Sequence, residues 1–138
     1  MEKQPVLSGE AFMAALRNFA QSDPDETTIK SVIKWMAETA AACDKTKITE
    51  EISKRMDSLI DTCSGIEKLL LLLNITGTLF ALYLESGKVI ISEMFPPGAR
   101  ICKVCNARGD MSYGIEHTSV CAVGKLLEAI TAKKEATT

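Results

Sequence analysis

The feature that most constrains the fold of this chain is a group of metal-binding residue types in its last third. Cys102 and Cys105 enclose two residues, and His117 and Cys121 enclose three. A CxxC turn lets two thiolates point at one ion, and positions i and i+4 of a helix share a face. Structural zinc takes four such ligands in a tetrahedron. The spacing therefore predicts one structural Zn²⁺ held by Cys102, Cys105, His117 and Cys121.

The segment 102–121 resembles the class of small zinc modules with three cysteine ligands and one histidine. The resemblance covers this segment and not the rest of the chain. Gly109, Asp110 and Gly114 suit a loop that folds back to bring the two ligand pairs together. The alternative is that the cysteines are free thiols and that His117 caps or flanks the last helix.

Two kinds of chemistry are less favoured for this group. A redox CxxC of the thioredoxin type lies between a strand and a helix, whereas Lys103 and Val104 lie in a loop with further ligands downstream. A catalytic Cys–His pair needs an open coordination position, which four protein ligands do not leave. The sequence shows no general acid–base pair and no phosphate loop, so we expect no enzyme.

The other two cysteines, Cys43 and Cys63, fall at a helix end and on an apolar helical stripe. We expect both to be small buried thiols. The chain has five cysteines, and its first residues include Glu2 and Lys3 without an apolar run. These features argue against a disulfide framework and a secretory signal, and predict a cytoplasmic protein. The apolar runs 69–73 and 79–84 are shorter than the roughly 18 residues of a membrane span, so we expect no membrane contact.

Apolar periodicity predicts three amphipathic helices in the first half of the chain. They cover residues 8–20, residues from the N-cap Asp25 to 43, and residues from Thr46 or Thr49 to 63. Residues 66–73 include five consecutive leucines without a polar face. This segment is expected to be buried on all sides or covered by a partner chain.

Beyond residue 77 the sequence predicts a β-hairpin and a final helix. Residues 78–84 and 88–95 are typical of strands, with a turn at 85–87, and a continuous helix through Tyr83 is the main alternative. Pro96-Pro97-Gly98 ends regular structure. Residues 117–132 predict the last helix, with Val120, Val123, Leu127 and Ile130 on one face.

The expected fold is therefore mainly α, with four to five helices, one β-hairpin and a C-terminal zinc-binding module. Residues 1–96 would form a helical domain that ends in the hairpin. Residues 97–132 would form the zinc module and C-terminal helix, packed as one domain with the rest, and 133–138 a frayed tail. A chain of 138 residues with 46 % hydrophobic residues is long enough for one such core.

The leading functional hypothesis is a non-enzymatic zinc-binding interaction or regulatory protein. Its apolar helices would form a homodimer or bind a protein partner. A second hypothesis is a nucleic-acid-binding regulator, because the segment from residue 98 onward has six basic residues and four acidic ones and so carries a net positive charge. The candidate phosphate contacts are Arg100, Lys103, Arg108 and Lys125. A third hypothesis is a small-molecule-binding sensor with a pocket among the helices.

Overall fold

The computed structural model describes residues 4–44, 47–92, 99–110 and 114–131. Within these residues it contains five helices and four strands. The helices are α1 (Gly9–Gln21), α2 (Glu26–Cys43), α3 (Lys47–Thr62), α4 (Ile66–Glu85) and α5 (Ala122–Thr131). The strands are β1 (Ile90–Ser92), β2 (Ala99–Cys102), β3 (Arg108–Asp110) and β4 (Gly114–Ile115). The mainly α fold with a small β element is confirmed.

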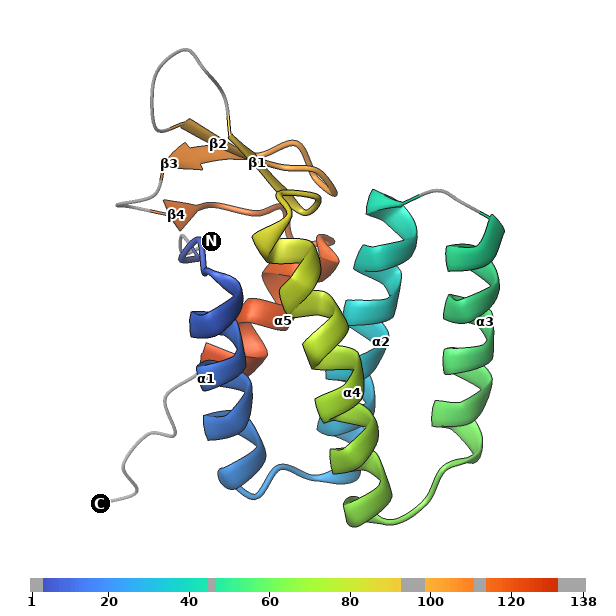
Figure 1. Cartoon of the computed structure of the whole chain (residues 1–138). Helices are drawn as coiled ribbons and strands as arrows, with labels where there is room; N and C mark the ends of the chain where they lie inside the picture. Colours follow the sequence, from blue (N-terminus) through green and yellow to red (C-terminus); the bar gives the residue numbers. More distant parts are fainter. Residues whose placement is uncertain (1–3, 45–46, 93–98, 111–113, 132–138) are drawn as a thin grey trace, which may run out of the picture.

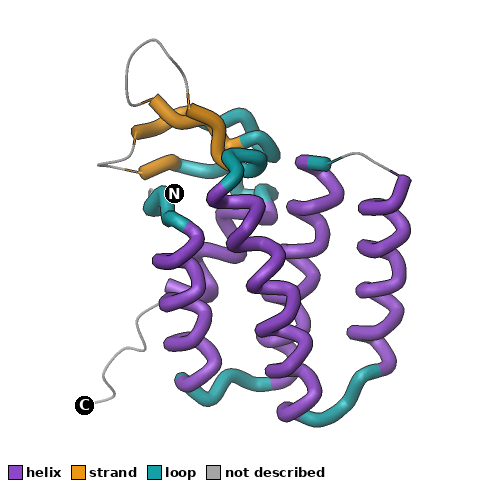
Figure 2. The backbone as a smooth tube through the Cα atoms, in the orientation of Figure 1, coloured by secondary structure: helices purple, strands orange, loops and turns teal. Residues whose placement is uncertain are grey.

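The helices form a bundle, and the sheet covers one end of it (Figure 1). α4 packs against α1 and α2, α5 packs against α2 and α1, and α3 lies on the outside against α2. The tube in Figure 2 shows the sheet gathered at the end where α1 begins and α4 ends. The strands pair antiparallel in the order β1-β2-β3-β4. The largest fully buried core side chains include Phe12, Ile29, Ile33, Met36, Ile60, Leu69, Leu73 and Leu126.

Side-chain caps begin the first two helices. The Ser8 hydroxyl accepts a hydrogen bond from the Ala11 N–H at 3.1 Å, and the Asp25 carboxylate accepts one from the Thr28 N–H at 2.7 Å. Hydrogen bonds from the side chain and backbone of Thr28 also lower the pKa of Asp25. The N-cap that the sequence predicted at Asp25 is confirmed.

The prediction of the first hairpin strand, residues 78–84, is wrong. Residues 78–84 belong to α4, which continues to Glu85, so the alternative of a continuous helix through Tyr83 is correct. The helix is favoured because Gly77, Phe80 and Ala81 share the buried face that packs on the bundle. A hairpin does occur later, since β1 pairs with β2, and the residues between these strands lie outside the described part.

α4 is not buried on all sides within the chain. Leu69 and Leu73 are in the core, whereas Leu71 on the opposite face is exposed. Among the described residues, α4 is also the one helix that is long and apolar enough, by length and composition, to cross a membrane. The core helix of a soluble protein can have the same composition, and a third of the α4 window is buried inside this bundle.

The last helix begins later than its sequence pattern predicted. α5 starts at Ala122, and Val120, which was expected on the core face, is 80 % exposed. The Cys121 N–H donates to the Thr118 carbonyl at 3.1 Å, which closes a turn instead of a helix. The Cys121 carbonyl then accepts the Lys125 N–H at 3.1 Å and begins the helical bonding. Residues 132–138, the expected helix end and tail, lie outside the described residues.

Candidate metal centre

Four side chains meet where the sheet joins α5. Cys102 ends β2, Cys105 lies in the turn before β3, and His117 and Cys121 lie between β4 and α5. The three sulfurs and one imidazole nitrogen all lie within 4.8 Å of one another. The structure therefore brings together all four residues that the spacing singled out, in a group that can bind a metal ion.

Three of the distances between these ligand atoms lie between 3.5 and 3.8 Å. Cys102 Sγ lies 3.8 Å from Cys121 Sγ. His117 Nδ1 lies 3.5 Å from Cys105 Sγ and 3.6 Å from Cys121 Sγ. No disulfide is formed, since all five cysteines are free among the described residues. The four ligand atoms thus lie close together, with no covalent bond between the sulfurs.

The Cys102–Cys105 turn is held by its own backbone. The Asn106 N–H donates to the Cys102 carbonyl at 2.8 Å, and Asn106 has a positive φ of 62°. The backbone N–H groups of Val104 and Cys105 donate to the Cys102 sulfur and lower its pKa, against larger opposing effects. Asparagine tolerates this left-handed conformation better than most residues. The turn therefore brings both sulfurs into the same group of ligand atoms.

A turn, rather than a helix, brings His117 and Cys121 together. The prediction that they occupy positions i and i+4 of one helix is wrong, because α5 begins only at Ala122. Gly124, in the first turn of α5, lies against the His117 ring, and a Cβ there would sit 2.8 Å from the Cβ of His117. His117 is 2 % exposed. The first turn of α5 thus packs directly against the His117 side chain.

The hydrogen bond between the Cys102 and Cys121 sulfurs shifts their pKa values in opposite directions. The hydrogen bond with Cys121 raises the pKa of Cys102, and burial raises it further. The same bond lowers the pKa of Cys121 to about 3, despite burial. The His117 side chain and the Gly124 N–H at the start of α5 also lower the pKa of Cys121. Because the thiolate is the metal-binding form, the site already favours one ligand in its binding state.

Cys43 lies near this group as a buried thiol. Burial raises the pKa of Cys43, and the positive charge of Lys103 partly offsets the effect. The Lys103 ammonium donates to the Cys43 carbonyl at 3.3 Å, which ties the cysteine turn to the end of α2. The prediction of a buried thiol holds for Cys43, whereas Cys63 is only half-buried.

The four basic residues do not share one surface. Arg100 pairs with Gly109 across the sheet, and Arg108 pairs with Ile101. Because neighbouring strand residues point to opposite faces, Arg100 and Arg108 project from opposite sides of the sheet. Lys103 is engaged with α2, and Lys125 is an exposed residue of α5. The fold therefore does not gather them into the single basic patch that phosphate contacts favour.

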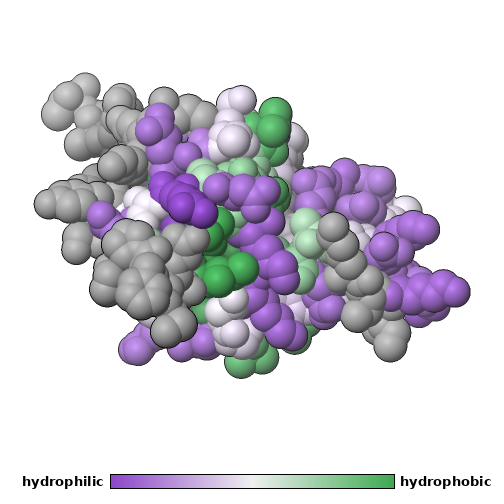
Figure 3. All heavy atoms as spheres, turned by 90° about the horizontal axis from the view of Figure 1, so that it is seen from above, coloured by the Kyte–Doolittle hydropathy of each residue, from purple (hydrophilic) through white to green (hydrophobic). Residues whose placement is uncertain are grey.

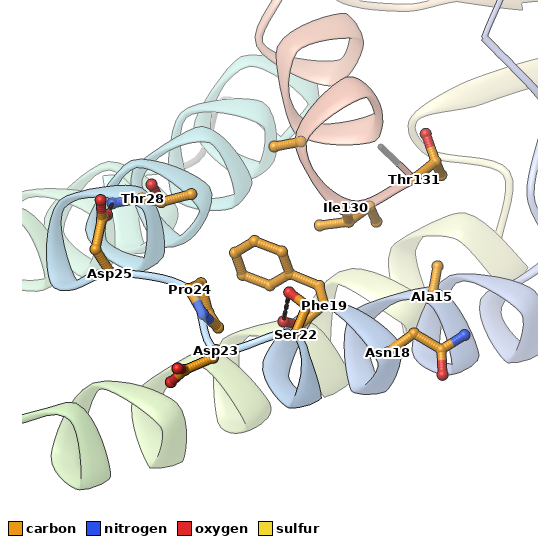
Figure 4. Close-up of a pocket in the computed structure, with 11 residues that line it drawn as sticks. Ala15, Asn18, Phe19, Ser22, Asp23, Pro24, Asp25, Thr28, Ile130 and Thr131 are labelled. Carbon is orange, nitrogen blue, oxygen red and sulfur yellow. Dashed lines mark hydrogen bonds between the residues drawn. The ribbon is translucent and has the colours of Figure 1, made fainter. Parts of the chain in front are cut away.

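Other parts of the surface offer hollows but no metal-binding group in the described chain. A hollow of about 640 Å³ lies between the α1–α2 turn and the end of α5, with Phe19 and Ile130 beside Asp23 and Asp25 (Figure 4). Seen from the sheet end, hydrophobic residues gather near the centre, whereas the side where α3 lies is largely hydrophilic (Figure 3).

The sequence reasoning missed two residues that shape the site. These are Gly124, which makes room for His117, and Asn106, which closes the cysteine turn. For Gly124, the signal available in the sequence was its position three residues after the candidate ligand Cys121.

No protein family, curated protein or solved structure matches this chain.

Proposed function

We propose that this chain is a non-enzymatic zinc-binding protein that acts through contacts with proteins, and that its zinc is structural. Typical Zn–S and Zn–N distances of about 2.3 Å and about 2.0–2.1 Å give tetrahedral edges of about 3.8 Å between sulfurs and about 3.5 Å between sulfur and nitrogen. The sulfur–sulfur distance is 3.8 Å, and the sulfur–nitrogen distances are 3.5 and 3.6 Å. This agreement is the observation that carries the proposal.

The ligand chemistry supports both the choice of metal and its role. Thiolates and imidazole select zinc or a similarly soft ion over Mg²⁺ or Ca²⁺, which prefer oxygen ligands. Four protein ligands complete the coordination sphere and leave no position for a substrate or an activated water. The ion would link the β2–β3 turn to the segment before α5, and so fasten the sheet to the helical bundle.

Metal analysis tests this proposal directly. Protein purified without a chelator should contain one zinc per chain. X-ray absorption should show three sulfur neighbours at about 2.3 Å and one nitrogen at about 2.0–2.1 Å. Cys105→Ser should lose the metal, whereas Cys63→Ser should keep it because Cys63 is not one of the four grouped residues. Metal-free protein, or equal metal loss in both variants, would contradict the proposal.

A further inference from the structure

A groove of about 200 Å³ lies between the outer helix α3 and α4, with residues of α2 in its lining. Ile52 and Met56 of α3 form one wall, and Leu79 and Tyr83 of α4 form the other. α3 packs mainly on α2. Ile60, near the end of α3, is completely buried, whereas Ile52 is 54 % exposed. The groove is therefore an open space beside the first half of α3, where that helix is not sealed against the bundle.

The lining of this groove is apolar and adaptable. None of the described residues that line it is charged. Met36 of α2 and Phe80 of α4 are almost completely buried and form its inner surface. Met36 and Met56 are unbranched and flexible, and a thioether makes favourable contacts with aromatic rings. Ligand pockets are predominantly lined by such hydrophobic and aromatic side chains.

Water is a poor occupant of this groove. A buried water molecule needs two to four polar partners. The Thr76 hydroxyl already donates to the Leu72 carbonyl at 2.8 Å. Ser53 and Tyr83 supply the other polar side-chain atoms of the described lining. An apolar cavity of about 150 Å³ holds one benzene molecule, so this groove has room for one ring or a short alkyl chain.

A positive charge lies beside the Tyr83 wall of the groove. The Lys88 ammonium is 5.1 Å from the centroid of the Tyr83 ring, and Lys88 is exposed. Glu85, two residues after Tyr83, is directed elsewhere, because its carboxylate accepts the Gly9 N–H at 2.6 Å. An anionic group of a bound molecule can therefore reach Lys88 while the apolar part of that molecule lies in the groove.

We propose that this groove binds a small apolar carboxylic acid. Its ring or short alkyl chain lies between α3 and α4, and its carboxylate lies at Lys88. The uncharged lining selects the apolar part, and the ammonium selects an anionic head over a neutral or cationic one. None of the four grouped metal-binding residues lines this groove. The proposal therefore does not depend on zinc, and the metal analysis and the tests below can fail separately.

The first test titrates octanoate into the full chain with isotope-labelled methionine methyl groups and follows them by NMR. The signals of Met36 and Met56 should shift and saturate. Met13 is the internal control, because it lies on α1 and does not line the groove. Unchanged Met36 and Met56 signals at millimolar octanoate would overturn the proposal. Signals that follow protein concentration instead of octanoate would place a second copy in the groove and overturn it as well.

The second test compares three probes with the same chain and different heads. Octanoate should bind more tightly than octanol or octylamine. Lys88→Met should weaken octanoate binding roughly threefold, as expected for an exposed ion pair, and leave octanol binding unchanged. Lys68→Met is the matched control, since Lys68 is an exposed lysine near the opposite end of α4. Equal affinities for the three probes, or octanoate binding that is insensitive to Lys88→Met, would exclude a carboxylate at Lys88.

The third test fills the groove from α2. Ala40 is half-buried and lines the groove, so Ala40→Phe should abolish octanoate binding. Ala42→Phe is the control, because Ala42 is a half-buried residue of α2 that does not line the groove. Circular dichroism checks that both variants are folded. Octanoate binding by a folded Ala40→Phe variant would show that the groove is not the site.

Discussion

At position 124 only a hydrogen atom fits beside the imidazole of His117. The His117 Cβ would lie 2.8 Å from a Cβ at this position, closer than two carbon atoms can pack without a shift. Gly124 also donates its backbone N–H to the Cys121 sulfur. Gly124 thus supports two of the four grouped side chains, because it leaves room for His117 and donates a hydrogen bond to Cys121.

Gly124→Ala is therefore expected to weaken zinc binding. The added methyl must displace the His117 ring, and loss of such supporting contacts typically costs about 10–100-fold in metal affinity. Alanine also favours a helix over glycine by about 1 kcal/mol, so α5 itself should not be weakened. Competition with a chromophoric chelator measures the affinity. Lys125→Ala on the exposed side of α5 is the control, and equal affinities for the two variants would count against the role given to Gly124.

At the scale of elements, the crossing of α1 and α4 decides the shape of the bundle. The rings of Phe12 and Phe80 pack with their centroids 4.8 Å apart. Gly77 faces Leu16, and the Glu85 carboxylate accepts the Gly9 N–H at 2.6 Å where α1 begins. The two helices can approach closely because position 77 has no side chain.

Gly77→Ala should lower the free energy of unfolding. A Cβ at this position would overlap the Cδ2 atom of Leu16, which is itself buried, so the two helices must separate or Leu16 must leave its rotamer. Overpacking of this kind costs about 1–3 kcal/mol, against a gain of up to about 1 kcal/mol in helix propensity. Urea denaturation measures the difference. The neighbouring exposed residue provides the comparison: Thr78→Ala should change the stability by less than about 0.5 kcal/mol.

At the scale of the whole molecule, the sheet is attached to the bundle at a few points. The Lys103 ammonium, next to β2, donates to the Cys43 carbonyl at the end of α2 at 3.3 Å, and Ile115 of β4 belongs to the same buried core as the helices. Gln4 exchanges two backbone hydrogen bonds with Ile115, at 2.7 and 2.8 Å. Helices α1, α2 and α4, in contrast, bury large side chains against one another. The short strands therefore depend on the metal group more than the helices do.

Removal of the proposed zinc should consequently loosen the sheet before the bundle. Binding of structural zinc contributes roughly 10–16 kcal/mol in isolated peptides, much of it coupled to folding. In Cys105→Ser, hydrogen exchange should become faster over residues 99–121, whereas α1, α2 and α4 keep their protection. Cys63→Ser should behave as the wild type. Unchanged protection around His117 in the Cys105→Ser variant would contradict this division of stability.

Several elements could be predicted because their signals lie within a few residues of one another. The Asp25 cap needs only the Thr28 N–H three residues along, and the turn that pairs Cys102 with Cys105 needs only their CxxC spacing. Residues 78–84 were assigned wrongly because a continuous apolar run fits a strand as well as a buried helix. The start of the last helix was also predicted wrongly. The Cys121 N–H bonds to the carbonyl three residues earlier, as in a turn, whereas a helix would bond it to the carbonyl four residues earlier, and the apolar pattern does not distinguish the two.

By itself, the sequence determined the mainly α class, the first two helix starts and the four residues that gather as a metal-binding group. These depend on local spacing, capping and side-chain chemistry. Only the tertiary structure decided which face of α4 is buried, why position 124 must be glycine, and that Arg100 and Arg108 point apart. Each of these depends on contacts between segments far apart in the chain. Such contacts are set by the packing of whole elements, which the pattern along one segment does not contain.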